Sequence, residues 1–457
     1  MTTYVANPAA LREPPTAPGL PLIGSAHPFM RAKGIPVAFL REIAAQYGDL
    51  VRIKIGGQSF YLPSHPDLIH EVLVKRVNEF HKPVFASGKR VGLARFLGEG
   101  ILTADHEVWR PQRKLIQPLM HTKHIATYAD TMGRFGEQLL ALWQDGAERD
   151  IHADMTQVTM WIIADTMFGT NVSETSAIEA AGHDAQAITV ADLMSPIPAW
   201  LAGRDRHSVE INNVLTTLVD RFMGERRAQG NADRYDLLSL LMETRDEDGQ
   251  PVSDEFVRDN ILTLFFAGHE TTANTLTWAF YYLDQNPHVA ARLQEEVDIV
   301  LGGRLPTLDD LPQLPYTLMV IKETMRIEPT VAAFPRFIME ATELAGYQLK
   351  GNSIIFIPPY VLHHDARWWS QPDQFDPTRF SAENEPTIPK YAYLPFGGGP
   401  RVCIGNHFAL MEAQILLAVI ASRYQLHLVP GTPVKPVRHV TSSPENGLPM
   451  RLERRAS

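Results

Sequence analysis

A single cysteine, Cys403, is present among the 457 residues, and it lies in the glycine-rich segment 396–405, FGGGPRVCIG. A lone cysteine cannot form an intrachain disulfide or a multi-cysteine zinc site, which leaves a single thiolate ligand, a nucleophile or a buried structural thiol. The glycines let the backbone pass close to a large flat object. Because a helix-compatible apolar run follows and Arg401 adds positive charge, the surroundings favour a thiolate ligand.

A second unusual segment is 267–272, AGHETT, inside the most apolar helical stretch of the chain. A glycine there weakens a helix by roughly 1 kcal/mol relative to alanine, and threonine side chains can bond back to the previous turn. We expect a local opening of the helix where a ligand sits. The alternative is that Thr271 and Thr272 are ordinary helix hydroxyls and that His269 and Glu270 are solvated.

Two pairs of residues at helical spacing could position or bind charge. Glu323 and Arg326 lie three residues apart among apolar residues, which predicts a partly buried ion pair. Trp109 and Arg113 lie four residues apart, and a planar donor beside a fixed cation suits a carboxylate. Pro111 between them fits only the first turn of a helix, so this helix is predicted to begin near residue 107.

The cysteine segment resembles the ligand loop of the cytochrome P-450 family, Phe-x-x-Gly-x-Arg-x-Cys-x-Gly. Its five fixed places are filled by Phe396, Gly399, Arg401, Cys403 and Gly405. The resemblance implies that Cys403 is the axial thiolate ligand of the iron of haem b. It also implies that Phe396 packs beside the sulfur and that Arg401 reaches a haem propionate.

Four further segments resemble elements of the same family, in the family's order. Segment 267–272 is similar to Ala/Gly-Gly-x-Asp/Glu-Thr-Thr/Ser. This similarity implies that Gly268 leaves space for oxygen, that Thr271 donates a hydrogen bond at the oxygen site and that Glu270 helps to relay protons. Elements similar to Glu-x-x-Arg and Pro-x-Arg-Phe imply a structural network that holds the cysteine loop, made of Glu323, Arg326 and Arg379. The remaining resemblances assign haem propionate contacts to Trp109, Arg113 and Arg336.

One departure from the family pattern lies just before Trp109. His106 stands where relatives often carry glycine. A histidine there is either a harmless residue of the helix cap or a further propionate neighbour, and we favour the first interpretation.

Composition excludes several classes of protein. The chain carries 42 basic and 52 acidic residues, a net charge of −10, which argues against nucleic-acid binding. Its apolar runs are far shorter than a membrane span, and the proline-rich leader 1–24 is not a signal peptide. Together with the single cysteine, this predicts a soluble, cytoplasmic protein, and the lack of an anchor indicates a bacterial member of the family.

The distribution of periodic segments predicts the architecture. Alternating apolar residues around 51–62 predict a hairpin, residues 105–330 are mostly helical, and strand-like segments follow Pro329. A last helix is predicted after Cys403, with strands to the C-terminus. We therefore expect one domain over 1–457, mainly α with small β-sheets (α+β). The resemblance implies the P-450 fold, with haem between a long central helix and the cysteine loop.

The resemblance implies a haem-thiolate monooxygenase that inserts one atom of O2 into a small hydrophobic molecule, with a role in secondary metabolism. Since the chain stops soon after the cysteine loop, electrons from NAD(P)H are expected to arrive through a separate ferredoxin or flavodoxin and its reductase. We expect a monomer. The alternatives are a peroxide-driven peroxygenase, which tends to lack the acid–threonine pair, and a non-catalytic haem sensor.

The position of the substrate pocket follows from the resemblance, but the substrate does not. Fatty acids, terpenes, steroids and polyketides all remain open. Arg90 and Arg95 could meet a substrate carboxylate, although surface charge is the preferred interpretation of both. The candidate pocket residues are Phe85, Phe96, Phe266, Ala267, Val331 and Phe334.

Overall fold

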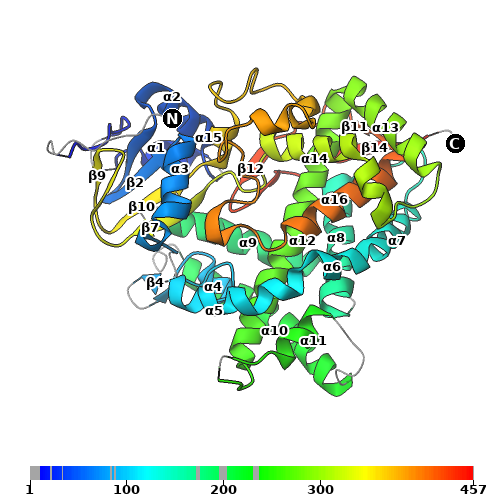
Figure 1. The fold of residues 1–457 in the computed structure, drawn as a ribbon, viewed down its shortest axis with the longest axis horizontal. Coiled ribbons are helices and arrows are strands. Elements are labelled where there is room, and N and C mark those ends of the chain that lie inside the picture. The colour runs from blue at the N-terminus through cyan, green and yellow to red at the C-terminus, as the bar shows by residue number, and fades with distance from the viewer. Residues whose placement is uncertain are drawn as a thin grey trace.

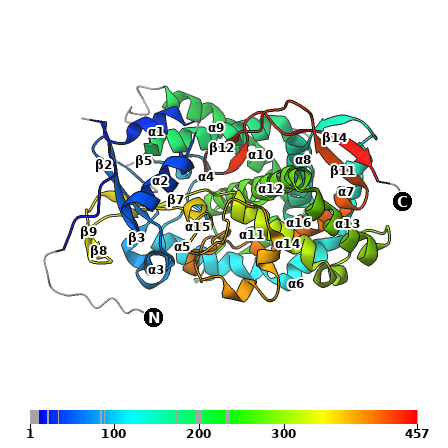
Figure 2. The same cartoon turned by 90° about the horizontal axis from the view of Figure 1, so that it is seen from above.

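The computed structural model describes residues 11–20, 23–32, 34–82, 85–86, 89–170, 175–194, 203–229, 236–246 and 248–455. Helices dominate, and small sheets lie at one side and near the C-terminus (Figures 1 and 2). The prediction of a mainly helical α+β fold is confirmed. The single-domain organisation stays a prediction. Of the leader 1–24, residues 1–10, 21 and 22 lie outside the described ranges.

The larger sheet joins distant parts of the chain in the order β1-β2-β10-β7-β3. The predicted hairpin is confirmed, because β1 and β2 pair antiparallel around a glycine turn, with Ile53 opposite Phe60. Strand β10 then pairs parallel with β2. The bounds of these strands are β1 Leu50–Ile55, β2 Gln58–Pro63, β3 Phe80–His81, β7 Phe334–Ile338 and β10 Ser353–Ile357.

Smaller sheets complete the strand-rich parts. The C-terminal sheet has the order β11-β14-β6, and β12 and β13 form a separate hairpin. The bounds are β4 Phe85–Ala86, β5 Lys89–Arg90, β6 Glu148–Asp150, β8 Thr342–Leu344, β9 Tyr347–Leu349, β11 Tyr424–Leu428, β12 Pro436–Arg438, β13 Ser442–Pro444 and β14 Pro449–Arg454.

Helix α12, Asp254–Gln285, runs through the centre of the molecule (Figure 1). Ser253 caps its start by accepting a hydrogen bond from the Phe256 N–H, and Asp254 and Glu255 complement the positive end of the dipole. Helices α8, α14 and α16 pack against it. The helices of at least seven residues are α2 Val37–Tyr47, α5 His106–Ile116, α7 Ala129–Leu140, α8 Ile151–Phe168, α9 Thr175–Met194, α10 Arg204–Gln229, α11 Leu237–Glu243, α12, α13 Pro287–Leu301, α14 Pro315–Ile327 and α16 Asn406–Ala421.

Short helices connect these elements. They are α1 Ala26–Arg31, α3 Pro66–His70, α4 Ala94–Leu97, α6 Thr122–Ile125 and α15 Pro359–His363. None of the helices in the described ranges has the length and apolar character that crossing a bilayer requires.

Helix α5 corrects one detail of the sequence analysis. It begins at His106, one residue before the predicted start, and continues to Ile116, so Pro111 lies in its second turn rather than its first. A proline at this position lacks the N–H that would bond to the carbonyl four residues earlier, on Glu107. The residues on either side of Pro111 keep their own bonds: the backbone N–H of Trp109 donates to the Asp105 carbonyl oxygen, and the Arg113 side chain donates to the Val402 carbonyl oxygen.

Candidate active site

A cavity of about 1130 Å³ is lined both by the cysteine loop, 394–405, and by residues of α12. Cys403 is solvent-accessible, and its accessible surface faces this cavity. From α12, Phe266, Ala267, Gly268, Glu270 and Thr271 reach the same space. The structure therefore brings the two segments that the sequence analysis singled out to one cavity, from elements more than a hundred residues apart.

Glycines fix the path of the cysteine loop. Gly397 and Gly399 have φ angles of 70° and 69°, a region that side chains disfavour. A Cβ on Gly399 would lie 2.0 Å from the carbonyl oxygen of Leu73, so no larger residue fits there. The N–H of Cys403 donates to the Phe396 carbonyl oxygen at 3.0 Å and closes the loop. Close approach to Leu73 therefore explains Gly399, and the positive φ explains Gly397.

Opposing effects act on the pKa of the Cys403 thiol. Burial raises the pKa of the Cys403 thiol, while the N–H of Gly405 and the guanidinium of Arg113 oppose this shift. The largest of these effects is the loss of solvation at the protein-lined bottom of the cavity, so the loop and the helix N-terminus alone do not lower the pKa of the thiol. The cation that acts on the sulfur is Arg113 rather than Arg401. A metal ion at this position would deprotonate the thiol outright.

Helix α12 is unbroken around the AGHETT segment, so the expected opening is not present. The Thr271 hydroxyl donates to the Ala267 carbonyl oxygen at 2.9 Å, and Thr275 donates to that of Thr271 at 2.9 Å. These bonds accompany the helix without opening it. His269 is buried, and its ring Nδ1 lies 2.7 Å from the Phe265 carbonyl oxygen, which excludes a solvated position.

Gly268 has a packing reason that the motif did not reveal. A Cβ on this residue would lie 2.6 Å from the Ile163 side chain of α8. The glycine therefore allows α8 and α12 to approach closely. It also lines the cavity, and its role in leaving space for oxygen stays a prediction.

One end of the cavity is lined by cations. Arg113, Arg336, Arg401 and Lys82 line it together with Trp109, whose ring lies 4.5 Å from the guanidinium carbon of Arg401. Burial lowers the pKa of Arg336 to about 9 and that of Arg401 to about 10. It also lowers the pKa of Lys82, a residue that the sequence analysis missed because no motif contains it.

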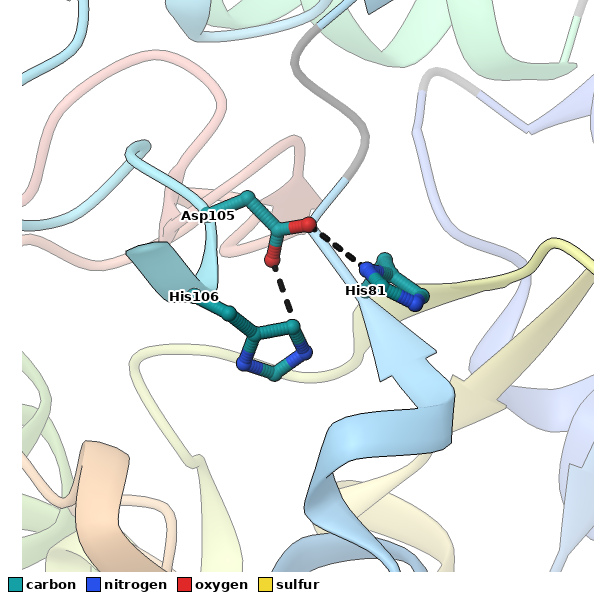
Figure 3. A group of neighbouring side chains, drawn as sticks. All are labelled: His81, Asp105 and His106. Carbon is teal, nitrogen blue, oxygen red and sulfur yellow. Dashed lines mark hydrogen bonds and ion pairs between the residues drawn. The ribbon is translucent and has the colours of Figure 1, made fainter. Parts of the chain in front are cut away.

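Asp105 lies between two of the histidines near these cations, His81 and His106 (Figure 3). Its carboxylate lies 2.7 Å from His81 Nδ1 and 3.7 Å from His106 Nε2, and Arg401 Nη2 is 3.6 Å away. His106 Nε2 and Arg401 Nη2 are buried, and beyond these longer contacts to Asp105 neither has a hydrogen-bond partner among the described residues. His81, Asp105 and His106 are close enough to hold a metal ion, but the neighbouring Arg401 opposes a second cation.

Whether haem fits this cavity can be judged from the two buried nitrogen atoms, His106 Nε2 and Arg401 Nη2. A flat macrocycle with two carboxylates would give Arg401 Nη2 and His106 Nε2 acceptors and would neutralise the buried cations. Cys403, which lines the same cavity, would ligate its iron. The residues present fit haem b. Trp109, Arg113, Arg336 and Arg401 would hold its propionate side.

The predicted network of Glu323, Arg326 and Arg379 is present in the structure. Arg326 forms two hydrogen bonds with Glu323 at 2.7 Å each, and both side chains are fully buried. Arg379 Nε lies 3.4 Å from Glu323 Oε1. Arg326 also donates to main-chain oxygens of His363, Pro372 and Gln374, so it joins α14 to the segment that leads to the cysteine loop.

Most of the candidate pocket residues line the cavity, while the side chain of Phe85 lies outside the described residues. The residues that line it are Phe96, Phe266, Ala267, Val331 and Phe334. Arg95 is not a surface charge, because its side chain is 16% exposed and pairs with Asp192 at 2.9 Å and Asp205 at 2.8 Å. These carboxylates neutralise Arg95, which disfavours its role in binding a substrate carboxylate.

A cavity lined by a lone thiol, several cations and an acid–threonine pair fits the class of haem-thiolate proteins. The chain belongs to the cytochrome P-450 family, because the family model described as Cytochrome P450 matches residues 14–449. The family implies a haem cofactor and oxygenase activity. The predicted membership of the cytochrome P-450 family and the predicted monooxygenase activity are therefore confirmed.

Relatives and a solved structure support this assignment. The chain is 38% identical to cyclooctatin synthase of Streptomyces melanosporofaciens over 92% of its length and 91% of the relative's. It is 35% identical to cyclooctat-9-en-7-ol 5-monooxygenase of the same organism, with coverages of 91% and 90%. It is 33% identical to pentalenene oxygenase of Streptomyces avermitilis, with coverages of 96% and 97%. The crystal structure of the cytochrome P-450DA heme domain matches with a TM-score of 0.87, 27% identity and 98% coverage of both chains.

Proposed function

We propose that this protein uses O2 to hydroxylate or epoxidise a cyclic terpene hydrocarbon or a terpene alcohol. The observation that carries the proposal is the large, mainly apolar cavity over Cys403, with Glu270 and Thr271 at its edge. The names of three relatives, two of them oxygenases by name, indicate the substrate class. We further propose a bacterial, cytoplasmic monomer that receives electrons from NAD(P)H through a ferredoxin or flavodoxin and its reductase.

Bound haem would activate oxygen, and its thiolate ligand favours O–O cleavage. The chain's own residues then have distinct tasks. Phe96, Phe266 and Phe334 exclude water and hold an apolar substrate. Thr271 offers a hydroxyl to the cavity, and the neighbouring carboxyl group of Glu270 relays protons to it. The buried cations orient the cofactor by its carboxylates.

The substrate class is tested by optical titration of the purified ferric holoprotein. We expect polycyclic terpenes and their alcohols to shift the haem from low to high spin, because an apolar ligand that fills the cavity displaces water from the iron. Fatty acids, steroids and macrolides serve as the comparison panel. A shift by fatty acids or macrolides alone would overturn the terpene assignment while leaving the enzyme class intact.

Replacement of Thr271 tests the proton-delivery role. We expect Thr271→Ala to lower product formation by about a hundredfold, the lower end of the usual effect of a positioned proton-transfer group. Oxidation of NAD(P)H should continue, with the consumed oxygen released as peroxide. Thr271→Ser, which keeps the hydroxyl, should restore most of the coupling. Normal coupling in Thr271→Ala would contradict the proton-delivery role of Thr271.

A further inference from the structure

Glu270 is held by two residues that no motif contains. Gln186 Nε2 donates a hydrogen bond to Glu270 Oε1, and the Thr441 hydroxyl donates to the same oxygen at 2.5 Å. Gln186 comes from α9, and Thr441 follows β12 in the turn before β13. All three residues line the cavity. Within the described part of the chain, Glu270 and Thr271 do not bond to each other, so Glu270 is positioned by these two residues instead.

The orientation of the Gln186 amide is fixed by a third bond. The backbone N–H of Thr441 donates to Gln186 Oε1 at 2.9 Å. Because an N–H can only donate, this end of the amide must be the oxygen, and the NH2 group must face Glu270. The Thr441 hydroxyl also lies 2.9 Å from Gln186 Oε1, so its single hydrogen can point to either acceptor.

The two residues are themselves rigidly placed. Gln186 is buried, and Gly182 one turn earlier allows α9 to approach α12, since a Cβ there would lie 2.9 Å from the Phe266 ring. Thr441 lies in a tight hairpin, where its carbonyl oxygen accepts from the His439 N–H at 3.0 Å. The next residue, Ser442, donates through its N–H to the Thr330 carbonyl oxygen at 2.8 Å and through its hydroxyl to Glu328 at 2.7 Å.

We propose that Gln186 and Thr441 are positioning residues that hold the Glu270 carboxyl group by Oε1 and leave Oε2 to exchange protons with the cavity. The NH2 group of Gln186 donates to Oε1, and the Thr441 hydroxyl lies within hydrogen-bond distance of the same oxygen, so these two residues hold Glu270 by Oε1. Oε2 has no partner among the described residues and belongs to a side chain that lines the cavity, which leaves it as the oxygen that exchanges a proton there. This inference rests on the proposed monooxygenase function.

The test replaces Thr441 with valine, which removes the hydroxyl and keeps the shape of the side chain. In the reconstituted holoenzyme with a spin-shifting terpene, we expect Thr441→Val to raise the ratio of peroxide to product about tenfold, the upper range for the loss of one ordinary hydrogen bond. Thr441→Ser should return the ratio to that of the wild type. Thr277→Val is the matched control on α12, because the Thr277 hydroxyl donates only to the Ala273 carbonyl oxygen, at 2.7 Å.

A second experiment, in the Glu270→Gln variant, distinguishes a purely structural role of Thr441 from a role that acts through Glu270. If Thr441 acts through Glu270, adding Thr441→Val to Glu270→Gln should change the coupling no further than Glu270→Gln alone. Unchanged coupling in Thr441→Val, or a full additional loss in the Glu270→Gln background, would overturn the proposal. Should Thr441→Val fail to retain haem, Gln186→Leu is judged by the same two criteria. If the wild type itself forms no oxygenated product from O2, the proposed function fails instead.

Discussion

Cys403→Ser is expected to eliminate oxygenation of every substrate while leaving the fold intact. Serine has the same shape, and the loop would keep the bond from the N–H of residue 403 to the Phe396 carbonyl oxygen. A serine hydroxyl is not deprotonated as a coordinating thiol is, so the iron would lose its thiolate and the electron donation that favours O–O cleavage. The measurements are product formation and the optical spectrum of the carbon monoxide complex of the reduced protein.

The single cysteine allows two controls for this variant. Because Cys403 is the only thiol in the chain, a thiol reagent should modify one group per haem-free wild-type molecule and none in Cys403→Ser. Haem loading should protect that group. Cys403→His should retain haem with an imidazole-type spectrum and no activity. Wild-type activity and spectrum in Cys403→Ser would show that another residue ligates the iron.

Glu323→Gln is expected to destabilise the protein by about 3–5 kcal/mol, the usual cost of leaving a buried charge without its partner. The substitution keeps the shape but leaves Arg326, which is fully buried, facing a neutral amide. A loss of this size is a large part of the stability of an ordinary domain, about 5–15 kcal/mol. The measurement is the urea midpoint of unfolding of the holoprotein, together with its haem content.

An exposed ion pair serves as the matched control for Glu323→Gln. Glu71 pairs with Lys75 at 2.6 Å on the surface. Glu71→Gln should change the free energy of unfolding by only about 0.2–0.5 kcal/mol, as is usual for such pairs. Equal midpoints for the two variants would contradict the assignment of the buried network as the support of the cysteine loop.

The parts of the site that could be predicted from the sequence are those formed by residues close together in the chain. The cysteine loop is recognisable because its glycines and Cys403 are contiguous and their spacing reflects a tight local path. Helix α12 is recognisable from its apolar periodicity. The ion pair of Glu323 and Arg326 is local to one helix turn, and only the family resemblance connected it with Arg379.

The parts that the sequence did not predict depend on contacts between distant segments. Lys82, Gln186 and Thr441 belong to no motif, and only the fold places them at the cavity. The raised pKa of Cys403 depends on burial, which a helix dipole argument does not include. The opening of α12 was expected from composition, but Thr271 and Thr275 satisfy their hydroxyls within an intact helix.

The most direct test of the proposed activity is the fate of labelled oxygen. The holoprotein with an electron-donor system and the terpene that produces the largest spin shift is allowed to turn over under 18O2. We predict a product that carries one labelled atom, with formation that requires the electron donor. A product without label, or one formed from peroxide equally well without the electron donor, would contradict the assignment as an O2-dependent monooxygenase.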